Sequence, residues 1–162
     1  MYTVAMGLLS RHKKEREKAS RFYNQINSVY CPFLSIKISF NSDGFHHLQY
    51  SSRSERDKNV QILKFSLIPA AKIIIEKSGT VQEYRKIWGT IGKKNKDGSQ
   101  KMNEIQYWGF VAITGEGSSQ IRVKTIVRQV GNGSPHFWSV MPDTRLKTRG
   151  TFKFASTDID NE

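Results

Sequence analysis

The chain has 162 residues, of which 37% are hydrophobic and 11% aromatic, which is enough for one folded domain with its own core. Lysine and arginine number 26 against 14 acidic residues, so the formal net charge is +12. This composition argues against a disordered chain and favours a polyanionic partner, because a positive field steers polyanions to the surface. Nucleic acid is the commonest such partner. The alternatives to nucleic acid are an anionic membrane and a charge that serves only solubility.

Cys31 is the only cysteine, so an internal disulfide is excluded. We expect it to be a small buried hydrophobic residue in a reducing compartment. No run approaches the apolar length that spans a membrane, and the N-terminal charges follow the apolar residues, the reverse of a secretory signal. The sequence therefore predicts a cytoplasmic protein that needs no membrane, metal or cofactor.

The first half of the chain favours helices. A helix is expected over Arg11 to Ser28, where no Gly or Pro interrupts the stretch and the charged front half is solvated. A short strand over 34–39 and a turn over 41–44 follow. Two further helices are expected over 55–65 and from Pro69 to Lys77, with a break at Pro69.

The second half favours strands, because strand-forming residues there are separated by short turns. The expected strands cover 81–88, 105–114, 120–130 and 136–141, and the stretch 92–101 forms a basic loop. We therefore predict an α+β fold with N-terminal helices packed on a C-terminal antiparallel meander of about four strands. Residues 1–154 would form this single domain, and residues 155–162 a flexible acidic tail.

The strand over 120–130 is the most informative segment. Strand periodicity places Arg122, Lys124 and Arg128 on one face, and Ile121 and Val127 on the other with Val123. Three cations on one face repel one another, so we expect an anion between them. A solubilising, exposed sheet face is the alternative.

The histidines lie at two further places. His136 follows a Gly-rich turn and would lie near the basic strand, with Trp138 or Phe137 available to stack on a base. His46 and His47 are adjacent, so on a strand only one of them faces a given site. His12, within the charged helix, is expected on the surface.

RNA suits these parts because it brings its own nucleophile, the 2′-hydroxyl. Its cleavage needs a base, an acid and positive charge at the phosphate, which histidine and arginine supply near neutral pH. DNA hydrolysis usually recruits metal ions on clustered carboxylates. Asp143, Glu104 and Glu116 are scattered beside turns, so the choice tilts toward RNA.

Three segments, 40–48, Ile121 to Arg128 and 136–140, resemble the barnase, EndoU, colicin and RelE-like ribonuclease superfamily, and its phage- and plasmid-borne branch most of all. The resemblance implies a metal-independent endoribonuclease, often a toxin with a protein antitoxin. In that likeness His47 matches the family histidine better than His46. Arg128 and Lys124 match the basic strand, and His136 and Ser139 match the polar positions of the last strand. No glutamate matches the general base of barnase.

The leading hypothesis is an endoribonuclease in which His47 and His136 transfer protons. The expected phosphate-binding residues are Arg128, Lys124 and Arg122, with Ser139 orienting the phosphate; Trp138, His46, Lys93 and Lys94 are expected to contact RNA. A non-catalytic RNA-binding module that uses the same basic sheet face is the alternative. A third hypothesis is an acidic protein partner, such as an antitoxin, that docks on Arg11 to Arg21 and on the loop 92–101.

Overall fold

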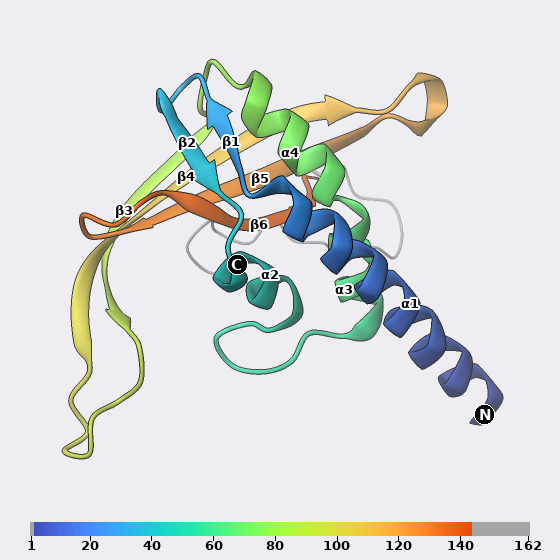
Figure 1. The fold of residues 1–162 in the computed structure, drawn as a ribbon, viewed down its shortest axis with the longest axis horizontal. Helices are drawn as coiled ribbons and strands as arrows, with labels where there is room; N and C mark the ends of the chain where they lie inside the picture. The colour runs from blue at the N-terminus through green and yellow to red at the C-terminus, as the bar shows by residue number, and fades with distance from the viewer. Residues whose placement is uncertain (1, 144–162) are drawn as a thin grey trace, which may run out of the picture.

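The computed structural model describes residues 2–143, so the predicted tail and the end of the predicted domain lie outside the described residues. The predicted α+β class is confirmed (Figure 1). The helices of the described part are α1 (Tyr2–Ile26), α2 (Ser42–Gln49), α3 (Lys58–Ser66) and α4 (Ile68–Lys77), with a 3₁₀ turn at Gly117–Ser119. Its strands are β1 (Ser28–Cys31), β2 (Ile36–Ser39), β3 (Glu83–Ile91), β4 (Lys101–Thr114), β5 (Ile121–Val130) and β6 (His136–Pro142).

The strands form one mixed sheet of six in the order β1-β2-β6-β5-β4-β3. Strands β3 to β6 are the predicted antiparallel meander. The prediction of a sheet of about four antiparallel strands is wrong, because β2 joins β6 in parallel through Ser39 and His136 and adds the hairpin β1–β2. A four-residue strand such as β1 is too short to show a periodicity, and β6, the parallel partner of β2, lies about a hundred residues farther along the chain.

Helix α1 is longer than predicted, because it begins at Tyr2 and ends at Ile26. Asn27 follows with a φ of 55°, the left-handed conformation that asparagine tolerates and that ends a helix. His12 is buried, with its Nε2 2.8 Å from Oε1 of Gln61, so the surface placement expected for it is wrong. Among the described helices, none has the length and apolar character to cross a membrane.

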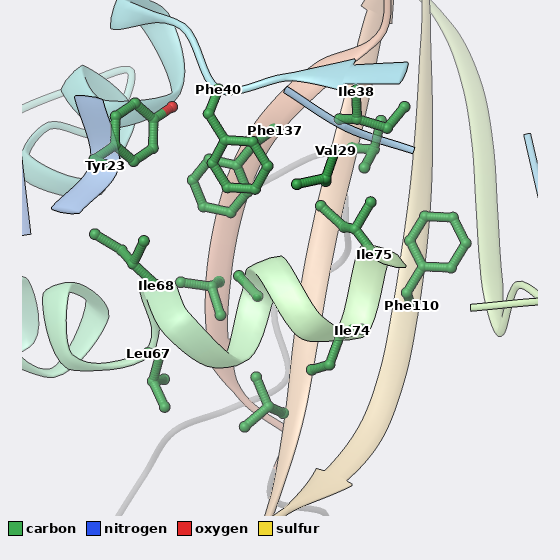
Figure 2. Packing of buried hydrophobic residues seen from close by; sticks show 14 of the residues in the cluster. Tyr23, Val29, Ile38, Phe40, Leu67, Ile68, Ile74, Ile75, Phe110 and Phe137 are labelled. Carbon is green, nitrogen blue, oxygen red and sulfur yellow. The ribbon is translucent and has the colours of Figure 1, made fainter. Parts of the chain in front are cut away.

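Helix α4 lies across one face of the sheet and begins directly after α3 at the break predicted around Pro69. Its buried residues follow helical spacing: Ile68, Ala71, Ile74 and Ile75. They pack with the side chains of β4, β5 and β6 (Figure 2). In that core the rings of Phe40 and Phe137 stack at 4.9 Å. This core stabilises the sheet, and the sheet positions the side chains of the candidate site.

Helix α2 replaces the predicted turn over 41–44 and the strand placement of the two histidines, both of which are wrong. Asn41 is its N-cap, and its side chain accepts a hydrogen bond from the Gly44 amide at 3.1 Å. The residues Asn-Ser-Asp suit a turn and a helix start equally well, because both use a short polar side chain to accept a backbone N–H. His46 and His47 consequently lie in the last turn of a helix.

Candidate functional site

A cleft of about 980 Å³ opens between α2 with the loop after it and the strands β3, β4, β5 and β6. Its lining combines cationic, imidazole and aromatic side chains from five different segments, including His46, His47, Arg53, Tyr107, Arg128 and Trp138. Four of these residues were predicted from the sequence, whereas Arg53 and Tyr107 were not. Tyr107 pairs with Arg128 across β4 and β5, and such a pairing is fixed by the register of two strands rather than by any local pattern.

Trp138 is central to this cleft because it contacts two of the predicted site residues. Ile126 pairs with Ser139 and Val127 with Phe137, so Trp138 is the extra residue of a β-bulge. Its ring stacks on His47 at 3.9 Å with 19° between the planes, and the guanidinium carbon of Arg128 lies 4.1 Å from its centroid. Bulges re-aim side chains, and this one brings α2 and β5 to the same indole.

Arg128 is held by rings on both neighbouring strands, since its guanidinium carbon also lies 5.9 Å from the centroid of Tyr107. Its Nε is buried and has no hydrogen-bond partner among the described residues. A guanidinium donates hydrogen bonds in a fixed planar fork that matches phosphate. Arg128 therefore combines a preset position, contact with the cleft and an unused donor.

His47 and His46 differ in their surroundings although they are neighbours. His47 is only 6% exposed, and its Nε2 lies 3.2 Å from Nη2 of Arg56. Arginine can only donate, so Nε2 of His47 accepts this bond and carries no proton. His46 is exposed and stacks on Tyr50 at 4.5 Å.

His136 is buried beside the cleft and is not part of its lining. Burial lowers its pKa, and the charge of Arg128 lowers it further, while a backbone hydrogen bond at Ser134 and the charge of Asp43 oppose the shift. Its ring is therefore neutral at pH 7. His136 contacts Trp138 edge-on at 5.9 Å, so both histidines of the predicted proton-transfer pair contact the same indole. Of the two, only His47 lines the cleft.

The anion expected between Arg122, Lys124 and Arg128 is supplied in part by the protein itself. Arg122 Nε lies 2.9 Å from Oδ2 of Asp143, and Lys124 Nζ lies 2.7 Å from Oε1 of Glu83. Lys124 is 1% exposed, so it is a structural ion-pair partner rather than a surface cation. Strand periodicity placed these cations on one face of β5, but it could not show which carboxylates approach that face.

Replacing Lys124 with methionine should lower the free energy of unfolding by about 3 kcal/mol, the lower end of the usual cost of breaking a buried ion pair, because a nearly buried Asp143 loses part of its compensating charge. Urea denaturation followed by circular dichroism measures the change. Lys86→Met is the matched control, since the pair between Lys86 and Glu104 is solvent-exposed and should leave the midpoint unmoved. An unchanged midpoint for Lys124→Met would contradict this structural role.

Ser139 is fully buried, and its hydroxyl accepts a hydrogen bond from Nζ of Lys64 at 3.1 Å. It therefore ties α3 to β6 and is not part of the cleft lining. Lys93 and Lys94 are exposed in the loop between β3 and β4, directly after Gly92, which lines the cleft.

Within residues 2–143, no group of three metal-ligating side chains lies close enough together to hold an ion. What the cleft does present is a fixed guanidinium, an imidazole and stacked aromatic rings. Comparison of the chain with protein-family models, with curated proteins and with solved structures gave no match.

Proposed function

We propose that the cleft binds RNA and cleaves it without a metal ion, and that the protein is an endoribonuclease that acts as a bacterial toxin. The observation that carries the proposal is the packing of the Arg128 guanidinium and the His47 ring on one indole, that of Trp138, at the wall of an open cleft. These are a phosphate-binding group and a group that can transfer a proton near neutral pH, held in a fixed relation.

The residues that line the cleft suit the binding of a single RNA strand. Arg128 and Arg53 offer charge to phosphates, and Tyr107 and Trp138 offer aromatic surface next to them. Proteins hold unpaired nucleotides by this combination of cations that follow the backbone and aromatic rings on which bases stack. The net charge of +12 adds long-range attraction.

Cleavage would begin with removal of the 2′-hydroxyl proton. In the free protein Arg56 donates to Nε2 of His47. When the 2′-hydroxyl displaces that guanidinium from Nε2, Nε2 is able to accept the hydroxyl proton. The 2′-oxygen attacks phosphorus, the bond from phosphorus to the 5′-oxygen breaks, and solvent water protonates the leaving 5′-oxygen. Arg128 stabilises the charge that develops on the phosphate, and the products are a 2′,3′-cyclic phosphate and a 5′-hydroxyl.

A toxin of this kind acts on cellular RNA in the cytoplasm and is kept inactive by an antitoxin. The complementary antitoxin is acidic, because the surface that it must cover is strongly basic. The resemblance of residues 40–48 and of the strands that contain Arg128 and His136 to the barnase and RelE-like ribonucleases supports this part of the proposal.

The test is incubation of the full chain with end-labelled single-stranded RNA in EDTA. We expect fragments that end in 2′,3′-cyclic phosphate, while the same sequence as DNA stays intact because it has no 2′-hydroxyl. If the protein binds RNA of several sequences and cleaves none of them, as free RNA or on ribosomes, the catalytic part of the proposal is wrong.

Arg128→Ala should slow cleavage by about 10²- to 10³-fold, the usual loss when one preorganised charge-stabilising donor is removed. Arg122→Ala is the matched control: it removes one arginine from the same strand, but Arg122 is already paired with Asp143. We expect it to change the rate less than about threefold at a temperature where the variant is folded, because Arg122 does not line the cleft and its charge is already directed to the buried Asp143. Equal losses in single-turnover assays of the two variants would show that net charge matters and the position of Arg128 does not.

A non-catalytic RNA-binding module is the second candidate. It is favoured by the bond that already occupies Nε2 of His47 and by the burial of His136, which leaves no unoccupied imidazole of the predicted pair in the cleft. This candidate predicts strongly salt-dependent binding without cleavage, and an effect of Arg128→Ala on affinity alone.

A further inference from the structure

Strands β3 and β4 extend beyond the body of the molecule as a two-stranded arm. Figure 1 shows it projecting from the opposite side to the N-terminal end of α1. We call residues 92–101 the arm tip. Nine successive cross-strand pairs, from Glu83 with Gly109 to Ile91 with Lys101, hold the arm together.

The arm tip is strongly basic and its charge is unneutralised. It contains four lysines, Lys93, Lys94, Lys96 and Lys101, and one acidic residue, Asp97. The Asp97 carboxylate accepts hydrogen bonds from the Ser99 amide at 2.9 Å and the Ser99 hydroxyl at 2.6 Å, which hold the pKa of Asp97 below its usual value. Across residues 2–143, none of the four lysines has an ion-pair partner.

Hydrogen bonds within the arm tip close it into a defined loop. The Asn95 amide donates to the Ser99 carbonyl at 2.7 Å, and the Gln100 side chain donates to the Gly92 carbonyl at 2.6 Å. Gly98, with a φ of 84°, makes the turn that this closure requires. The lysines are therefore presented on an ordered loop, which lowers the entropy lost when they bind a ligand.

The cleft leads directly to the arm tip, because Ile87, Gly89 and Gly92 of the arm line one wall of it. Arg85 pairs with Tyr107, and Tyr107 with Arg128, so this row marks the phosphate-binding end of the cleft. Ile91 lies six residues farther along β3, a distance of about 20 Å at the usual rise of a strand. A stacked nucleic acid strand covers that distance in about six nucleotides.

We propose that the arm tip is a second phosphate-binding site for the RNA strand that occupies the cleft. The protein would then favour RNA that extends about six nucleotides beyond the residue held at Arg128. This inference rests on the proposed function, and it specifies the substrate class: long single-stranded RNA, recognised at the arm tip through its backbone and not its sequence.

Two triple variants test it. Lys93→Gln/Lys94→Gln/Lys96→Gln removes three charges from the arm tip, and Lys13→Gln/Lys14→Gln/Lys18→Gln removes three exposed charges from α1 as the matched control. Fluorescence anisotropy at several salt concentrations would measure binding of 2′-fluoro RNAs of about five and about 20 nucleotides, which cannot be cleaved and bracket the proposed span.

We expect the arm variant to bind the longer RNA about 10- to 50-fold more weakly at physiological salt and to show a salt slope smaller by about 2, as expected from three lost phosphate contacts. Its affinity for the shorter RNA should stay unchanged, and the α1 variant should match the wild type on both.

Three results would overturn the inference: full affinity of the arm variant for the longer RNA, an equal loss in the α1 variant, or an equal loss for the shorter RNA. Loss of binding to an acidic protein partner alone would instead make the arm tip a protein interface. The proposed function itself is wrong if the wild-type protein binds neither of the two RNAs, or if it cleaves no RNA. An arm variant that still cleaves short RNA would be consistent with the proposed function.

Discussion

Replacing His47 with glutamine is expected to slow RNA cleavage by about 10²- to 10⁴-fold, the usual contribution of a positioned base, and to change RNA affinity little. The side-chain oxygen of glutamine can accept the bond that Arg56 donates to Nε2 of His47, so this substitution keeps the local hydrogen bond. It removes the group that can take the 2′-hydroxyl proton. Single-turnover rates and equilibrium binding, measured on the same variant, separate the two effects.

His46→Gln is the matched control, because His46 is the neighbouring residue and lines the same cleft. The two rings differ in how they are held. His47 is fixed against Trp138 beside Arg128, whereas His46 is exposed and stacks on Tyr50. A base must be held within hydrogen-bonding reach of the attacking hydroxyl, so the fixed ring is the better candidate. If His46→Gln slows cleavage and His47→Gln does not, our assignment of the base is wrong.

The sequence predicted the parts of this fold that show a clear period or a clear break. Strands β4, β5 and β6 are rich in strand-forming residues and are separated by short turns, and α3 and α4 are separated at Pro69, so both features were found. Periodicity also gave the face of β5 on which Arg128 lies. It missed β1, which is too short to show a period, and α2, whose first residues suit a turn as well as a helix.

The candidate site was harder to predict because its members meet through tertiary contacts. Glu83 and Asp143 reach Lys124 and Arg122 from β3 and from the residue after β6, and Arg56 reaches His47 from the loop before α3. Only the packed structure brings these residues together. The period of the strand predicts that Lys124 lies on the same face as Arg122 and Arg128. It does not predict that carboxylates lie against that face. The bulge at Trp138, which joins His47 to Arg128, is likewise a property of two paired strands.

Gly44→Ala is expected to lower the free energy of unfolding by about 3 kcal/mol, the upper end of the usual cost of overpacking. A methyl group on Gly44 would lie 2.3 Å from the carbonyl oxygen of Phe137 and 2.6 Å from the hydroxyl of Tyr23. Neither atom has room to yield. The carbonyl belongs to the backbone of β6, and the buried Tyr23 hydroxyl donates to the Asn41 carbonyl at 2.7 Å.

Gly7→Ala provides the control for this substitution in a helix. Nothing lies within 4 Å of a methyl group at Gly7 in α1, so alanine there should stabilise the protein by up to about 1 kcal/mol through its better helix propensity. Urea denaturation compares the two variants. A Gly44→Ala protein as stable as the wild type would mean that α2 does not sit as closely on β6 as the structure places it.

The same variant links the fold to the cleft. Gly44 lets α2 approach the backbone of Phe137, and the next residue in β6 is Trp138, on which His47 of α2 stacks. If the added methyl group pushes α2 away from β6, it also withdraws His47 from Trp138 and Arg128. Cleavage by Gly44→Ala, measured at a temperature where the protein is still folded, should therefore fall by about tenfold or more, as small displacements of a positioned group cost that much. A folded Gly44→Ala protein with full cleavage activity would separate the position of α2 from the chemistry and count against His47 as the base.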